Sequence, residues 1–336
     1  MNKIILTDVS LRDGSHAIQH QLTKDQIKLY AKASDDAGVP IIEVGHGNGL
    51  GASSLQVGQS RISDEEMLAT VRENIDKSKL GIHVIPGFAT INRDLSRALE
   101  LGVDVIRVAS HCTEADITQR HISYVRSKGK VAYGVLMMSH MADKETLLDE
   151  SLKMQTYGAE AVIIMDSAGA YMPADVTERI GHLAGNMKIP VGFHAHNNLG
   201  MGIANSIAAV EAGASMLDGS SRGFGAGAGN AAIEVLVAVL EKINYTTGIN
   251  LYGILDAAEL AEKQIMKTIP YISNVSLVSG LAGVFSGFSK HVTRIAGEYN
   301  LDPRDIFFEL GRRKVVAGQE DIILEVAREM AGKTSL

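Results

Sequence analysis

The sequence is poor in several features, and each shortage excludes a class of protein. Cys112 is the only cysteine, so no disulfide can form within the chain, and we expect a reducing compartment. Asp8 and Arg12 interrupt the apolar segment at the N-terminus, where a secretory signal would be uninterrupted. No apolar run is long enough to span a bilayer. We therefore expect a cytoplasmic protein that does not act at a membrane.

Positively charged residues are also fewer than negatively charged ones. Lysine and arginine number 32 against 39 aspartates and glutamates, which gives a net charge of −7 and disfavours nucleic acid as the main partner. Prolines number only six, whereas glycines number 34, which indicates many tight turns and close backbone approaches. Hydrophobic residues make up 46% and charged residues 21%, a balance typical of a globular enzyme-sized chain.

Short β-branched runs alternate with longer amphipathic segments through most of the chain. The eight runs cover 3–9, 40–44, 81–85, 104–109, 130–137, 161–165, 189–193 and 215–218. The eight amphipathic segments cover about 23–37, 63–77, 91–101, 114–128, 143–157, 173–185, 199–212 and 228–243. Thr23 with Gln26 and Ser63 with Glu66 form capping-box patterns, and glycines such as Gly38 follow several segments.

This alternation predicts a (β/α)8 TIM barrel over residues 1–265. The rival fold is a doubly wound sheet with a dinucleotide site, but Gly14 stands alone after the first strand, without the glycine-rich turn that such a site needs. Beyond about 250 the pattern changes to helices near 250–269, 280–299, 303–313 and 318–331. Residues 266–336 are thus predicted to form a C-terminal helical region, packed on the barrel or on a partner.

Polar side chains gather at the carboxyl ends of the predicted strands, which is where TIM barrels carry their chemistry. In "GFHAHNN", His194 and His196 lie two apart on a strand and therefore face the same side. Such a pair is either two satisfied core histidines or two ligands of one metal. A nearby carboxylate favours the metal, and Asp13 is the best candidate. Two imidazoles and a carboxylate suit Mn²⁺, Fe²⁺, Co²⁺ or Mg²⁺, whereas a closed zinc site is disfavoured.

The segment "LRDGSH" adds three more candidates. Arg12 and Asp13 form either a structural ion pair or, with a bend at Gly14, an anion-binding group beside a metal ligand. His16 is either a surface histidine or a base that takes a proton from a substrate hydroxyl. Asp8 and Glu43 are candidates for orienting Arg12 or a ligand. Ser167, in "MDSAG", either binds a carboxylate or caps the next helix.

Together these motifs resemble the family of 4-hydroxy-2-oxovalerate aldolases. The resemblance rests on "TDVSLRDGSHAIQHQ", "GHGNGLGASS", "MDSAGAYMP", "GFHAHNNLGMG", "LDGSSRGFGAGAGN" and the late "GQED", and it extends from about residue 3 to residue 330. This family belongs to the metal-dependent lyase barrels that also include 3-hydroxy-3-methylglutaryl-CoA lyase and the isopropylmalate synthases.

The resemblance implies retro-aldol cleavage of 4-hydroxy-2-oxo acids to pyruvate and an aldehyde, in the meta-cleavage catabolism of aromatic compounds. It implies Mn²⁺ as the cofactor, with Co²⁺ or Mg²⁺ as substitutes, and an acylating acetaldehyde dehydrogenase as partner, with the helical region as the candidate docking surface. By the same resemblance, Asp13, His194 and His196 match the metal ligands, and Asn230 matches a weaker ligand candidate. Arg12 matches the residue that contacts substrate and stabilises the enolate, and His16 matches the base.

Two further positions come from the resemblance. Ser167 matches a serine that contacts pyruvate, and Asp13, His194 and Arg12 count among the groups that would meet the substrate. In "LAGVFSGF", Phe285 stands where the family usually has tyrosine. Phenylalanine keeps the ring but lacks the hydroxyl, so the departure bears on stereochemical control at C4 and on the preferred aldehyde.

Three other functions remain open at this stage. A condensing enzyme of the isopropylmalate synthase type would join acetyl-CoA to a 2-oxo acid and release free thiol. Decarboxylation of oxaloacetate needs the same enolate and is a plausible side activity. A non-catalytic metal-binding scaffold would turn over no 2-oxo acid.

Overall fold

The computed structural model describes residues 3–316 and 318–334, and its centre is a closed parallel barrel. Hydrogen bonds join the eight strands in sequence order, and the last strand pairs with the first. The predicted TIM barrel is confirmed. The strands are β1 (Ile5–Leu11), β2 (Ile41–Val44), β3 (Lys79–Val84), β4 (Val105–His111), β5 (Val131–Met137), β6 (Ala161–Asp166), β7 (Val191–Ala195) and β8 (Met216–Gly219).

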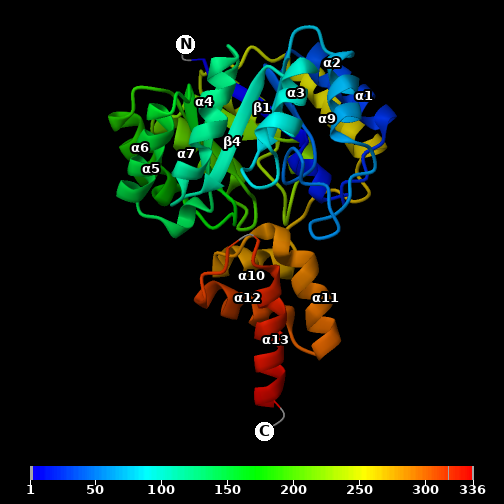
Figure 1. The fold of residues 1–336 in the computed structure, drawn as a ribbon, viewed down its shortest axis with the longest axis vertical. Helices are drawn as coiled ribbons and strands as arrows, with labels where there is room; N and C mark the ends of the chain where they lie inside the picture. Colours follow the sequence, from blue (N-terminus) through cyan, green and yellow to red (C-terminus); the bar gives the residue numbers. More distant parts are fainter. Residues whose placement is uncertain (1–2, 317, 335–336) are drawn as a thin grey trace.

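Helices follow the strands and surround the barrel (Figure 1). They are α1 (Lys24–Asp36), α2 (Asp64–Arg72), α3 (Ser96–Glu100), α4 (Gln119–Ser127), α5 (Lys144–Thr156), α6 (Pro173–Asn186), α7 (Gly202–Glu211) and α8 (Ile233–Lys242). Both predicted capping boxes form, Thr23 with Gln26 and Ser63 with Glu66. The next helix, α9 (Leu251–Gln264), packs against α1 and α8 and so completes the outer layer of the barrel.

The apolar core has two compartments in the barrel. One lies between the strands and the surrounding helices and includes Leu6, Leu80 and Phe193. The other lies inside the barrel and includes Val105, Val135 and Ile163. Because side chains alternate along a strand, each strand supplies both compartments. The polar groups described below share the inner compartment, toward the carboxyl ends of the strands.

The C-terminal region consists of four helices with an apolar core of their own. They are α10 (Asn274–Ala282), α11 (Ser289–Tyr299), α12 (Pro303–Arg312) and α13 (Glu320–Thr334), and Phe288, Phe307 and Val326 lie in their shared core. The single helix predicted over 280–299 is wrong. Gly283, with a φ of +65°, ends α10 in the left-handed conformation that favours glycine. A short loop then leads to α11.

These four helices lie beyond the carboxyl ends of the barrel strands (Figure 1). Hydrogen bonds fix them there: the Asn198 side-chain amide donates to the carbonyl of Ser276 and the hydroxyl of Ser279, and His140 pairs with the carbonyl of Gly283. The helical region therefore covers the rim at which the site residues gather. Among the described residues, no helix combines the length and apolarity that crossing a bilayer requires.

Candidate active site

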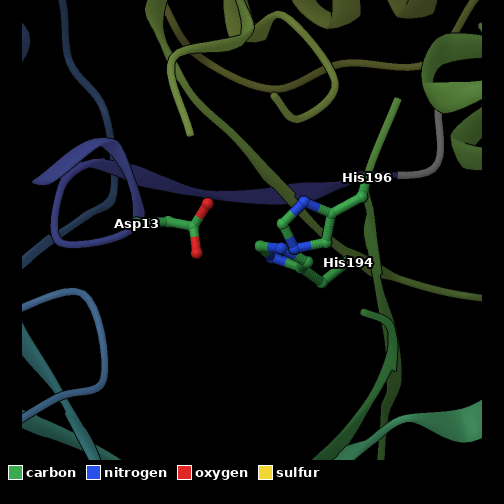
Figure 2. A group of neighbouring side chains, drawn as sticks. All are labelled: Asp13, His194 and His196. Carbon is green, nitrogen blue, oxygen red and sulfur yellow. The ribbon is translucent and has the colours of Figure 1, made fainter. Parts of the chain in front are cut away.

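Three side chains from opposite ends of the sequence meet at the barrel rim. Asp13 reaches from the segment after β1 toward the imidazoles of His194, near the end of β7, and His196, just after it (Figure 2). One potential ligand atom from each residue lies within 4.8 Å of the other two, and all three residues are buried. The structure therefore brings together the three residues that the sequence nominated, in a geometry that could hold one divalent cation.

The unpaired atoms of this group also suit a cation. The Nδ1 atom of His194 lies 2.9 Å from a carboxylate oxygen of Asp218, and its buried Nε2 has no hydrogen-bond partner. Nδ1 of His196 is likewise buried without a partner. A carboxylate that holds one ring nitrogen and leaves the other free is the arrangement that orients metal-binding histidines. Burial lowers the pKa of His196 to about 4, so its imidazole is neutral as a ligand must be.

Arg12 and Asp13 reach the same site because the chain bends between them. Residues Asp13–His16 form a single 3-10 turn, as the predicted bend requires, but the expected reason is wrong. Gly14 does not adopt a left-handed φ; a Cβ there would come within 2.3 Å of the Phe224 ring. Glycine is thus needed for close packing rather than for backbone freedom.

The Arg12 guanidinium makes two buried ion pairs. Its Nε donates to Glu43 at 2.6 Å and its Nη1 donates to Asp13 at 2.7 Å. Burial alone would raise the pKa of Asp13, but the charge of Arg12 and those of the neighbouring histidines together outweigh it and hold that pKa below its ordinary value. Nη2 of Arg12 is buried with no partner. Arg12 can therefore be both a structural ion-pair partner and an anion-binding group. The ion pairs fix its side chain, and Nη2 stays free to bind an anion.

A second arginine lies beneath the site in the barrel interior. Arg107, on β4, donates from Nη1 to Glu43 at 3.0 Å and from Nη2 to Asp218. Burial would lower the pKa of Arg107, but the two carboxylates outweigh that effect and raise it. Because Glu43 also holds Arg12, and Asp218 also holds His194, one guanidinium connects both halves of the site.

His16 lies at the end of the same 3-10 turn and packs on the loop after β2. A Cβ on Gly47 would come within 2.4 Å of the His16 Nε2 atom. Beside it, the rings of His20 and His46 stack at 3.6 Å between centroids. Burial lowers the pKa of His16, so its imidazole is neutral and can accept a proton.

A cavity of about 400 Å³ opens onto these groups. It is lined by Arg12, Asp13, His16 and His196, by Ser167 at the end of β6, and by Phe285 from the helical region. The Ser167 hydroxyl accepts a hydrogen bond from the backbone N–H of Met138 at 2.9 Å. Ser167 and Phe285 thus lie at the wall of the same cavity.

Other candidates lie elsewhere or act differently. Asn230 donates to Asp13 at 2.8 Å, and its own amide oxygen is buried without a partner, beside the metal candidates. Asp8 does not contact Arg12; it accepts hydrogen bonds from Ser10, from Tyr30 at 2.6 Å and from Ser34. Of the two proposed orienting carboxylates, only Glu43 holds Arg12.

The sequence did not assign Arg107 or His83 to the site, and it gave Asp218 no role. His83, on β3, lines the cavity, and its buried Nδ1 has no partner. A usable signal existed for Arg107, which interrupts the apolar run "VIRVA". A charge in a strand that is buried on both faces requires a partner inside the protein.

Comparison with known proteins gives two family matches that together cover most of the chain. The HMGL-like family matches residues 3–261, and the DmpG-like communication domain matches residues 270–332. The second match coincides with the helices that cover the rim.

Curated relatives are similar along nearly their whole length. A protein of Pectobacterium atrosepticum, named 4-hydroxy-2-oxovalerate aldolase, is 61% identical over 98% of this chain and 96% of its own. A protein of the same name from Spirochaeta aurantia is 62% identical over 98% of this chain and 97% of its own.

Solved structures share the fold at low sequence identity. The N-terminal domain of a putative aldolase from Bacteroides vulgatus has a TM-score of 0.73 at 22% identity, covering 88% of this chain and 98% of that one. The carboxyl transferase domain of Rhizobium etli pyruvate carboxylase, with pyruvate and biocytin, has a TM-score of 0.82 at 16% identity. It covers 99% of this chain and 61% of that one.

Proposed function

The chain belongs to the HMGL-like family and, within it, to the 4-hydroxy-2-oxovalerate aldolases, and from this premise we propose the substrate and the roles of its residues. The substrate is 4-hydroxy-2-oxopentanoate or a close homologue. The products are pyruvate and an aldehyde such as acetaldehyde. The proposed setting is the meta-cleavage catabolism of aromatic compounds in the cytoplasm, where the lone buried thiol of Cys112 stays reduced.

Asp13, His194 and His196 would hold the metal, which we propose to be Mn²⁺, with Co²⁺ or Mg²⁺ as substitutes. One carboxylate and two neutral imidazoles suit such ions, and three protein ligands leave coordination positions for a 2-oxo acid. When bound, the cation would supply a Lewis acid at the 2-oxo group. The unpartnered nitrogens of His194 and His196 support this assignment.

The other groups move one proton and stabilise one negative charge. His16 takes the proton from the C4 hydroxyl, the C3–C4 bond breaks, and C4 becomes the aldehyde carbon. The electron pair of that bond forms the enolate of pyruvate, which is then protonated at C3. Arg12 faces the developing charge with its free Nη2, which two carboxylates hold in place. Ser167 contacts the pyruvate end of the substrate, and Phe285 covers the cavity from the helical region.

The single observation that carries this proposal is that Arg12, Asp13, His16 and His196 line one cavity, with His194 beside Asp13 and His196 in the candidate metal group. The test is pyruvate release from 4-hydroxy-2-oxopentanoate in the presence of Mn²⁺, followed by a coupled lactate dehydrogenase assay. Wild-type protein that releases no pyruvate would overturn the proposed reaction.

Two variants test the roles separately. Asp13→Ala should abolish both activity and Mn²⁺ binding, whereas His16→Ala should lower kcat by about 100-fold or more and leave Mn²⁺ binding intact. Asp116→Ala is the matched control, because Asp116 is exposed and does not line the cavity, and the change should affect neither property. Full metal-dependent activity in Asp13→Ala would refute the ligand assignment.

The helical region, residues 266–336, is the proposed docking surface for an acylating acetaldehyde dehydrogenase that takes the aldehyde product. The match to a communication domain supports this role. So do large apolar side chains that stay exposed there: Tyr271 is 67% exposed, Leu281 61% and Phe308 51%.

Mutation of one such side chain gives the test. Phe308→Glu should weaken co-elution with the dehydrogenase during size-exclusion chromatography without changing pyruvate release by the isolated aldolase. Leu55→Glu is the matched control, since Leu55 is 91% exposed but belongs to the barrel loops. Equal co-elution of all three proteins would place the docking surface elsewhere.

A further inference from the structure

One buried imidazole in the cavity has no part in the mechanism described above. His83 lies on β3, where Gly81, His83 and Ile85 face the barrel interior, and its residue surface is only 2% exposed. The ring lines the cavity, and Nδ1 is buried without a hydrogen-bond partner. Leaving a buried polar atom unpaired is unfavourable by about 1–3 kcal/mol, so a group that binds in the cavity is the natural partner.

The backbone holds this ring in place. The carbonyl of His83 accepts a hydrogen bond from the N–H of Leu50 at 2.8 Å. Gly49 packs so closely that a Cβ there would lie 2.4 Å from that carbonyl oxygen and 3.3 Å from Cδ2 of the ring. The imidazole is therefore positioned before any ligand arrives, which favours a specific contact.

The charge state of the His83 imidazole limits which chemical groups it can bind. Burial, together with the charges of Arg12 and Arg107, lowers the pKa of His83 to about 3, although Glu43 opposes them. A neutral imidazole offers one N–H donor and one lone pair. This pairing suits a hydroxyl, which both donates and accepts, better than it suits a carboxylate.

The lining of the cavity indicates which hydroxyl. It includes charged groups such as Arg12 and Asp13, and also the apolar Ile85, Pro86 and Phe88, which follow His83 in the chain. The charge of Arg12 acts on the His83 ring. A 4-hydroxy-2-oxo acid likewise has a polar end and an apolar end, with its carboxylate and ketone first, the C4 hydroxyl next and the alkyl end last. The hydroxyl would thus lie where the polar wall meets the apolar wall.

We propose that His83 binds the C4 hydroxyl of the substrate and thereby determines which C4 enantiomer the enzyme cleaves. This inference rests on the proposed aldol reaction. It also accounts for Phe285, whose ring lines the same cavity without a hydroxyl to offer. The hydrogen bond that positions the substrate hydroxyl comes from a barrel strand rather than from the helical region above it. His83 is a substrate-contacting residue that sets specificity, and it leaves proton removal to His16.

Two reactions distinguish the contact between His83 and the C4 hydroxyl from the functions of the other site residues. Cleavage of each enantiomer of 4-hydroxy-2-oxopentanoate requires the hydroxyl, whereas exchange of pyruvate C3 hydrogens with deuterium needs only enolate formation. His83→Leu should lower kcat/KM for the preferred enantiomer about tenfold, the loss expected for one neutral hydrogen bond. It should bring the enantiomer ratio toward one and change the exchange rate less than twofold.

Three further variants keep the proposal falsifiable. His83→Gln retains a donor and an acceptor and should recover kcat/KM to within about threefold of wild type, with an altered enantiomer ratio. Phe285→Tyr in the His83→Leu background should restore discrimination by supplying a hydroxyl from the helical region. His121→Leu is the matched control: it loses a hydrogen bond to the Ala89 carbonyl, outside the cavity, and should keep the enantiomer ratio.

The outcomes are distinct from those of the proposed function. If wild-type protein releases pyruvate but neither His83→Leu nor His83→Gln changes the enantiomer ratio, the role of His83 is refuted and the aldolase activity stands. A fall in exchange that parallels the fall in cleavage would show a merely structural role and would also refute it. If His83→Leu does not fold, the enantiomer ratio of His83→Gln decides alone.

Discussion

Replacing Arg107 by methionine tests whether the buried charge network holds the site together. The change keeps an unbranched apolar stem but removes the guanidinium that bridges Glu43 and Asp218. Each carboxylate keeps one partner: Glu43 keeps Arg12 at 2.6 Å, and Asp218 keeps Nδ1 of His194 at 2.9 Å. The variant therefore should fold, but with one positive charge fewer in the barrel interior.

The expected loss of stability is large. Removing one partner of a buried ion pair lowers the free energy of unfolding by about 3–5 kcal/mol, because the charges left behind stay buried with less compensation. For a chain of this size about 1 kcal/mol corresponds to about 2 °C in Tm, so the metal-free variant should melt about 6–10 °C below wild type. Three carboxylates, those of Asp13, Glu43 and Asp218, would then face the single guanidinium of Arg12.

The surplus negative charge gives a second signature. Because a divalent cation offsets it, Mn²⁺ should raise the Tm of Arg107→Met by more than it raises that of wild type. Differential scanning calorimetry with EDTA and with saturating Mn²⁺ measures both effects. Arg107→Lys is the graded control, since one point charge replaces the two-pronged contact. A metal-free Arg107→Met variant that melts within 2 °C of wild type would refute the reasoning.

Three other predictions follow from the site. Gly47→Ala should lower kcat by about 100-fold with little change in metal affinity, measured by kinetics and calorimetry, because a Cβ would come within 2.4 Å of His16 Nε2; unchanged kcat would contradict the placement of the base. EDTA should abolish pyruvate release, and Mn²⁺ at about 100 times its Kd should restore it and add about 2.7 kcal/mol to the free energy of unfolding; equal Tm with and without metal would contradict the site. Burial raises the pKa of Asp166 to about 6, above its value in the unfolded chain, so the folded state binds this proton more tightly and loses stability as pH rises from about 4 to 6. Asp166→Asn should flatten that part of the Tm–pH curve, and an unaltered slope would show that other groups cause it.

The three candidate metal ligands could be predicted from the sequence because the barrel topology alone brings them to one rim. In a closed parallel barrel, the ends of β1 and β7 open onto one rim, so Asp13 and the two histidines must be neighbours once the strands are correctly assigned. Period-two alternation also places His194 and His196 on one face. Neither argument needs knowledge of side-chain packing.

The supporting contacts could not be predicted in this way. Glu43 and Asp8 both lie near strand ends with similar surroundings in sequence, yet only Glu43 reaches Arg12, while Asp8 binds Tyr30. Which carboxylate meets which cation depends on the register and tilt of the strands. The break between α10 and α11 was missed for a related reason: Gly283 ends a helix through a local conformation that an apolar pattern does not reveal.

The roof of the cavity belongs to the helical region, and this has a thermodynamic consequence. Phe285 lies in the loop between α10 and α11, so any molecule that binds these helices and shifts the loop changes the free energy of the occupied cavity relative to the empty one. Linkage makes such an effect reciprocal. A partner that tightens substrate binding by some factor must itself bind the substrate-loaded enzyme more tightly by the same factor. Occupancy of the barrel would then decide how long such a partner stays bound.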